Sequence, residues 1–125
     1  IACSAFDGFA YGIRSALESS GYKAGADWPL ISGQDADLMA VKNIISGYQS
    51  MTIFKDTRIL AEKCASMEEA VLKGSEPESN DTTPYNNNVK IVPTYLCEPL
   101  AIDKDNYREI IVDSGYYTKE QLQIN

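Results

Sequence analysis

The chain has 125 residues, of which 44% are hydrophobic and 23% are charged, and these values are typical of a soluble globular domain with its own core. The formal net charge of -7 disfavours nucleic acid as a partner, because nucleic-acid-binding proteins usually present a basic face. The sequence contains no histidine, the commonest general base and metal ligand, and its three cysteines indicate neither a disulfide framework nor a metal site. We therefore expect no cofactor.

Short apolar segments predict strands, and amphipathic segments predict the helices between them. Strands are expected over residues 1–5, 30–32 and 50–55. Segment 89–96 is also rich in β-formers, but Pro93 has no N–H to donate, which indicates an edge position or a crossing between two bodies. Because strands alternate with helices, the sequence predicts a parallel α/β sheet, and such sheets bind ligands at the carboxyl ends of their strands.

The helices are expected after Asp7, over 36–46, over 57–73 and near 104–112, with a final turn near 118–122. Asp7 is a good N-cap residue for the first helix, and Asp56 or Thr57 can cap the third. Cys64 lies on the apolar stripe of that third helix, so it is expected to be a buried free thiol.

Polar or aromatic side chains follow the three predicted strands at their carboxyl ends: Phe6 with Asp7, Asp35 with Asp37, and Lys55. Helix capping is one explanation of Asp7 and Asp37, but Asp35 precedes the cap position and is explained less well in this way. Lys55 is either a surface lysine or a ligand contact, and Phe6 either packs in the core or stacks on a sugar. Carboxylates accept hydrogen bonds from hydroxyl groups, so these strand ends suit a neutral polyol.

Asp35 and Asp37 also admit two other interpretations. A pair of carboxylates is the pattern of an acid–base catalyst, and it is a weak pattern for a magnesium site. Neither pattern is specific, because two acids near the start of a helix are common without either role. The chain has no nucleophile motif and no phosphate-binding glycine motif, so we expect a protein that is not an enzyme and has no metal site.

The stretch ISGQDADLMAVKNIISGYQSMTIFKDTRILAEKC resembles the carboxyl-terminal part of the xylose- and glucose-type sugar-binding proteins that serve bacterial ABC importers. The resemblance continues through NNVKIVPTYL and VDSGYYTKEQL, so it covers nearly the whole chain. It implies the α/β fold of the type I periplasmic binding proteins, in which two lobes close on a sugar. Each lobe is a three-layer sandwich around a parallel sheet, and this chain corresponds to the carboxyl-terminal portion of that fold.

The resemblance also implies roles for the residues at the strand ends. The aspartate of GQD, here Asp35, binds sugar hydroxyls, and the lysine of TIFKDT, here Lys55, matches a ligand-contacting position. Phe6 stands where the family pattern has an asparagine that contacts the sugar, so a hydrogen-bonding amide is missing there. Asp7 matches the aspartate beside that asparagine. All four residues are therefore expected at a monosaccharide site.

By the same resemblance, the chain crosses between the two lobes. The expected parts are the second lobe over 1–53, a helix associated with the first lobe over 54–84, a hinge crossing over 85–97 and a carboxyl-terminal tail over 98–125. The chain begins inside a predicted strand, which indicates a piece of a longer protein. We expect such a piece to persist either as a proteolytic fragment or as a homo-oligomer that pairs its exposed strand edges, and a monomer in light scattering would contradict the second alternative.

The function implied by the resemblance is non-catalytic capture of a monosaccharide, such as xylose or glucose, for delivery to an ABC transporter permease. The expected location is outside the cytoplasm, either in the periplasm or lipid-anchored at the cell surface. The alternative on the same fold is a sugar-sensing regulatory module, acting as the partner of a membrane receptor or as the effector domain of a repressor.

Overall fold

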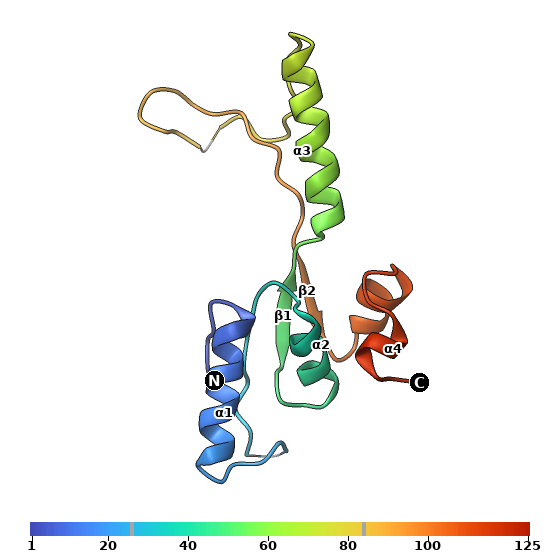
Figure 1. The fold of residues 1–125 in the computed structure, drawn as a ribbon. Helices are drawn as coiled ribbons and strands as arrows, with labels where there is room; N and C mark the ends of the chain where they lie inside the picture. The colour runs from blue at the N-terminus through green and yellow to red at the C-terminus, as the bar shows by residue number, and fades with distance from the viewer. Residues whose placement is uncertain (26, 84) are drawn as a thin grey trace. The chain divides into compact units, whose positions relative to one another are not determined.

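The computed structural model describes residues 1–25, 27–83 and 85–125, which form two compact units (Figure 1). Unit 1 comprises Ile1–Phe54 and Leu100–Asn125, and unit 2 comprises Lys55–Pro99. These limits fall close to the predicted ends of the second-lobe segment and of the hinge crossing. The assignment of each part to a lobe stays a prediction. None of the helices in the described parts of the chain has the length and apolar character of a membrane span.

The elements follow the predicted order along the chain. They are α1 (Asp7–Ser19), α2 (Leu38–Ile45), β1 (Met51–Phe54), α3 (Thr57–Leu72), β2 (Leu100–Asp103), the π-helix η1 (Arg108–Asp113) and α4 (Lys119–Leu122). The last predicted helix is thus shorter than expected and has π-type hydrogen bonds. The predicted final turn is confirmed as α4, which begins with a capping box between Thr118 and Gln121.

Three backbone segments of unit 1 run parallel to one another. Ala2 forms a parallel bridge with Ile31, and on the other side the Ile53 amide donates to Gly33 while the Asp35 amide donates to Ile53. The strands expected over 1–5 and 30–32 are reduced to that single bridge, because only a few ladder hydrogen bonds form there. The strand expected over 50–55 is confirmed as β1, which also pairs antiparallel with β2.

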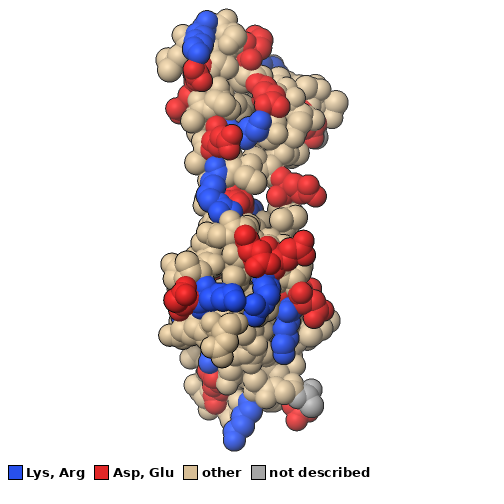
Figure 2. Space-filling view, turned by 90° about the vertical axis from the view of Figure 1, so that its right-hand side faces the viewer, with Lys and Arg blue, Asp and Glu red and all other residues tan. Residues whose placement is uncertain are grey.

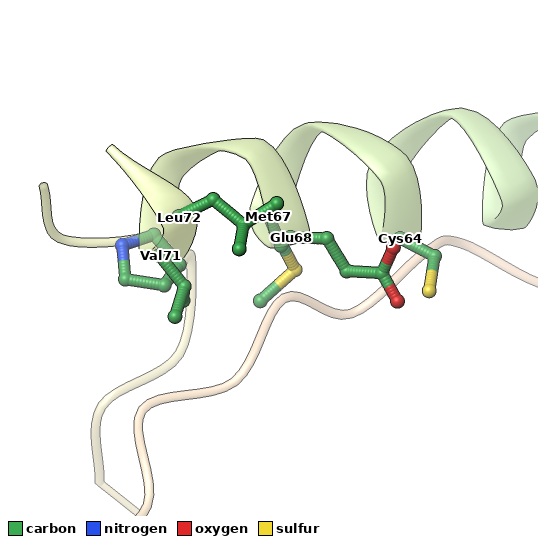
Figure 3. Close-up of a pocket in the computed structure, with 6 residues that line it drawn as sticks. Cys64, Met67, Glu68, Val71 and Leu72 are labelled. Carbon is green, nitrogen blue, oxygen red and sulfur yellow. The ribbon is translucent and has the colours of Figure 1, made fainter. Parts of the chain in front are cut away.

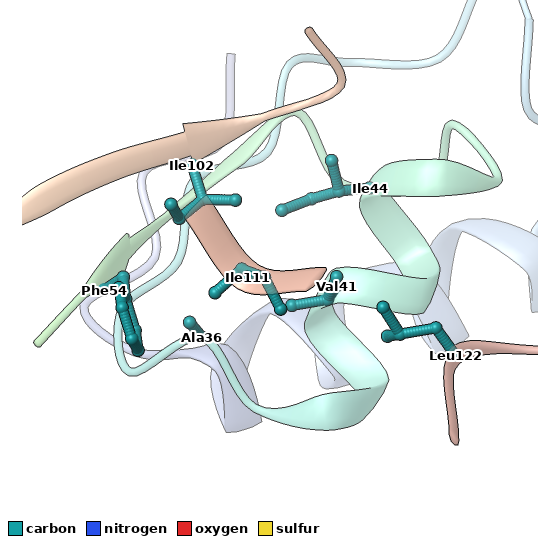
Figure 4. Close-up of a cluster of buried hydrophobic side chains, with 7 residues drawn as sticks. All are labelled: Ala36, Val41, Ile44, Phe54, Ile102, Ile111 and Leu122. Carbon is teal, nitrogen blue, oxygen red and sulfur yellow. The ribbon is translucent and has the colours of Figure 1, made fainter. Parts of the chain in front are cut away.

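The core of unit 1 joins elements from both ends of the chain (Figure 4). Its buried apolar side chains are Ala36, Val41, Ile44, Phe54, Ile102, Ile111 and Leu122. Because Ile111 lies on η1 and Leu122 on α4, the carboxyl-terminal tail packs with the first 54 residues rather than apart from them. Burying each large side chain of this cluster stabilises the unit by about 1.5 to 3 kcal/mol.

Helix α3 of unit 2 is amphipathic, but its apolar stripe is not buried. Within α3, all of which is described, no residue is buried, and Cys64 is an exposed free thiol. The prediction of a buried Cys64 was therefore wrong, because the stripe has no partner layer in the described part of unit 2. Instead, the stripe lines an open groove of about 600 Å³ (Figure 3), with Cys64, Met67, Glu68, Val71, Leu72 and Pro77 along it.

The second half of unit 2 has no regular strand among its described residues. The β-rich segment 89–96 makes only two isolated antiparallel bridges, one between Ile91 and Asn86 and one between Thr94 and Asp81. Pro93 lies between the two bridged positions and is exposed, so its missing N–H interrupts no ladder.

Asp56, one of the two cap residues that the sequence allowed, caps α3, and its removal should weaken the first turn of that helix. Its carboxylate accepts from the Arg58 amide at 3.0 Å and from the Arg58 guanidinium at 2.9 Å. We expect Asp56→Ala to cost about 1 kcal/mol. Amide hydrogen exchange at Arg58 and Ile59 measures the effect, and unchanged exchange would contradict it.

The stabilisation of α3 by this cap should also depend on pH. The hydrogen bond from Arg58 holds the pKa of the Asp56 carboxyl below its ordinary value. Because the folded pKa is lowered, the stabilisation is present above about pH 4 and is lost as the pH falls through the folded pKa. Asp56→Asn keeps a capping oxygen without the charge, so we expect its first-turn exchange to lack this pH dependence.

Candidate functional site

The start of α1 lies beside the turn that carries Asp35. The Asp7 amide donates to the Gln34 carbonyl at 3.0 Å, so the two strand ends are joined by a backbone hydrogen bond. The structure thus brings together Phe6, Asp7 and the Asp35 turn within unit 1. Lys55 follows β1 directly along the chain, is half-buried, and is the first residue of unit 2.

The Asp35 turn has an unusual backbone. Asp35 has a φ of 102° and Ala36 a φ of 53°, and neither residue is a glycine. Conformations of this kind cost about 1 to 3 kcal/mol each and persist only where the surrounding structure enforces them. Ala36 is fully buried in the core of unit 1, whereas Asp35 is exposed. The turn therefore anchors Ala36 in the core and leaves Asp35 at the surface of unit 1.

Asp7 is fully buried beneath this turn. One carboxylate oxygen accepts from Thr52 Oγ1 at 2.8 Å and Gln49 Nε2 at 2.9 Å, and the other accepts from the Asp37 amide at 2.9 Å. Burial raises the pKa of the Asp7 carboxyl above its ordinary value, and these hydrogen bonds oppose the rise. Its expected capping role was wrong: Phe6 occupies the N-cap position of α1, and Asp7 is a buried hydrogen-bond acceptor instead.

Phe6 lies at the surface rather than in the core. Its side chain is 40% exposed, and its ring centroid is 4.3 Å from that of Phe9, which is 59% exposed. The edge of the Phe6 ring covers Gly8 so closely that a Cβ there would come within 2.3 Å of it. Of the two alternatives that the sequence left open, packing in the core is therefore wrong, and stacking on a sugar stays a prediction.

Asp37 occupies the N-cap position of α2, as expected, but its side chain makes no capping hydrogen bond. Its carboxylate accepts a long hydrogen bond of 3.4 Å from the Tyr11 hydroxyl instead. Among the residues that the structure describes, no three acidic, cysteine or histidine side chains gather as a metal-ligand set.

Sequence reasoning missed Thr52 and Gln49, whose side chains donate hydrogen bonds to the buried Asp7. Thr52 is fully buried and Gln49 is 4% exposed. One signal was present for Thr52: in the alternating strand β1 it shares the inward face with Phe54, where an apolar residue is the usual choice. A polar residue at such a position needs a buried partner, and here the partner is Asp7.

Comparisons with known proteins match this chain to sugar-binding proteins. The multiple sugar-binding periplasmic receptor ChvE of Rhizobium radiobacter is 46% identical over 121 residues, which are 96% of this chain and 34% of the receptor. The D-xylose-binding periplasmic protein of Haemophilus influenzae is 44% identical over 92 residues, 74% of this chain and 27% of that protein. The chain is homologous to part of the periplasmic sugar-binding proteins. No family model matches it.

A solved structure confirms the fold. The chain superposes with a TM-score of 0.83 on an ABC transporter solute-binding protein from Clostridium phytofermentans with bound β-D-glucose, at 50% identity, over 94% of this chain and 35% of that one. The predicted α/β fold of the type I periplasmic binding protein kind is thereby confirmed for this portion. The chain spans about a third of the length of the relatives that it matches.

Proposed function

We propose that this chain supplies one side of a monosaccharide site in a non-catalytic solute-binding protein. The observation that carries the proposal is Asp35, an exposed residue on a turn held in a strained conformation, within a chain that is 46% identical to part of a multiple sugar-binding receptor. Strain of this kind is retained at ligand sites because it fixes the direction of a functional group. A carboxylate fixed in this way accepts hydrogen bonds from adjacent sugar hydroxyls.

Phe6 completes the proposal within unit 1, and a ligand contact by Lys55, the first residue of unit 2, stays a prediction. The exposed Phe6 ring offers an apolar surface to the C–H face of a sugar ring. Figure 2 shows acidic and basic side chains interspersed over the face that it draws. The formal net charge of -7 disfavours a polyanion as the ligand.

The relatives also suggest the setting in which the chain acts. Their names describe periplasmic sugar-binding proteins, and the solved structure is that of an ABC transporter solute-binding protein. We propose the same setting here: a binding protein rather than an enzyme, outside the cytoplasm, with an ABC permease as its partner. A sugar-sensing module is the less favoured alternative. Association of the chain through exposed sheet edges stays a prediction.

The test is a graft in which this chain replaces the aligned third of the Rhizobium radiobacter receptor. We expect isothermal titration calorimetry to show binding of D-glucose or D-xylose to the purified graft, because the other side of the site is then present. The isolated chain is the control, and it should give no clear signal at millimolar sugar, since half a cleft neither surrounds the ligand nor excludes water. A folded graft that binds no aldose would contradict the proposal.

A further inference from the structure

Two consecutive backbone amides follow Asp35, and both are held by buried side chains. The Ala36 amide donates to Thr52 Oγ1 at 3.2 Å, and the Asp37 amide donates to an oxygen of Asp7 at 2.9 Å. Thr52 Oγ1 in turn donates to the other oxygen of Asp7 at 2.8 Å. One carboxylate therefore holds both amides, one directly and one through a hydroxyl group.

This arrangement explains how Asp35 and Ala36 keep their positive φ values. Non-glycine residues leave that region unless neighbouring bonds compensate for its cost. Both amides would lose a buried acceptor if the turn relaxed, and an unpaired buried amide is itself costly. The network thus opposes relaxation of the turn.

Asp7 is itself unsuited to direct contact with a sugar. Its exposed fraction is 0%, and each of its oxygens already accepts from a protein donor. A third donor, Gln49 Nε2, lies 2.9 Å from Asp7 and 3.1 Å from the Met51 carbonyl, which ties the carboxylate to the start of β1. The Asp7 carboxylate is therefore held by side chains at and just before β1 and by a backbone amide of the Asp35 turn.

We propose that Asp7 is a positioning residue, which acts through Thr52 and the Asp37 amide to hold the Asp35 turn in its left-handed conformation and so aims the Asp35 carboxylate at the sugar. The inference rests on the proposed function of Asp35 as a sugar ligand. It gives Asp7 a different role from the sugar contact that the sequence suggested.

Nuclear magnetic resonance of the 125-residue chain tests the conformational part. In the wild type we expect slow hydrogen exchange at Ala36 and Asp37 and a positive-φ signature at Asp35 and Ala36; fast exchange at both amides would overturn the proposal without any variant. Asp7→Asn should shift the amide signals of the turn, because an NH₂ group then replaces one acceptor oxygen. Unchanged turn signals in that variant would also overturn the proposal.

Two further variants separate positioning from general stability. Thr52→Val removes the hydroxyl link but leaves Asp7 in place, so it decides the question if Asp7→Asn does not fold. Asn43→Ala is the matched control, since Asn43 is buried in unit 1 and its side chain accepts from Arg14 rather than from the turn. We expect turn signals to move in Thr52→Val and to stay in Asn43→Ala. Equal shifts in both would show a merely structural role.

A double-mutant cycle in the graft tests the functional part with D-glucose as the probe. Asp7→Asn alone should weaken binding by about tenfold or more, but in an Asp35→Ala background it should add less than about twofold, because residues that act through one another are not additive. Additive losses would overturn the positioning role. If Asp35→Ala has no effect while the turn signals move as described, the proposed role of Asp35 fails and the conformational role of Asp7 stands.

Discussion

Asp35→Ala is expected to lower the sugar affinity of the graft by about 2 to 4 kcal/mol, which corresponds to a rise of roughly 30-fold to 1,000-fold in Kd. The reason is that a carboxylate accepting two sugar hydroxyls makes charged hydrogen bonds, which are stronger than neutral ones. Calorimetry with glucose, xylose, galactose and arabinose measures the loss and also identifies the preferred sugar. Unchanged affinity would show that Asp35 is structural.

Asp105→Ala is a matched control for this substitution. It removes the same charge from an exposed position just after β2. Asp103, at the end of β2, pairs with Met51 at the start of β1, so Asp105 follows β2 near the start of β1, whereas the Asp35 amide donates to Ile53 nearer the end of β1. We expect its sugar affinity to match that of the wild type. Asp35→Asn adds a second comparison, because it keeps the side-chain shape and removes only the charge.

Gly33→Ala is expected to destabilise unit 1 by about 3 kcal/mol or more, since overpacking and broken buried hydrogen bonds each cost about 1 to 3 kcal/mol. A Cβ at this position would lie 2.1 Å from Asp7 Oδ1 and 2.4 Å from Gln49 Nε2. Both atoms are buried and hydrogen-bonded to each other, so neither side chain moves away without losing partners. Thermal and urea unfolding followed by circular dichroism measure the loss.

Gly12→Ala gives the contrasting result in the same chain. Gly12 lies inside α1, and a Cβ there meets no atom within 4 Å. Alanine is the better helix former, so we expect a gain of about 0.5 to 1 kcal/mol. If Gly33→Ala lowered the free energy of unfolding no more than Gly12→Ala does, this would contradict the close contact of Asp7 and Gln49 with Gly33.

Local patterns predicted the elements that depend mainly on neighbouring residues. The alternating strand β1, the helix α2 and the cap of α3 by Asp56 were confirmed, because periodicity and capping act over a few residues. The same local rules failed at Asp7 and Cys64. Asp7 is a good N-cap residue by type but forms a buried hydrogen-bond network, and Cys64 lies on an apolar stripe but is exposed. Both outcomes depend on what packs against the helix, which local rules do not describe.

The sequence by itself determined the α/β class, the order of the elements and the likeness to sugar-binding proteins, because these follow from periodicity, turn residues and motifs along the chain. It also indicated Asp35 as a candidate ligand. Only the tertiary structure decided that Asp7 lies beneath the Asp35 turn and is joined to it through Thr52. That network links residues 30 and 45 positions apart, and hydrogen bonds over such separations form only when the strands are packed side by side.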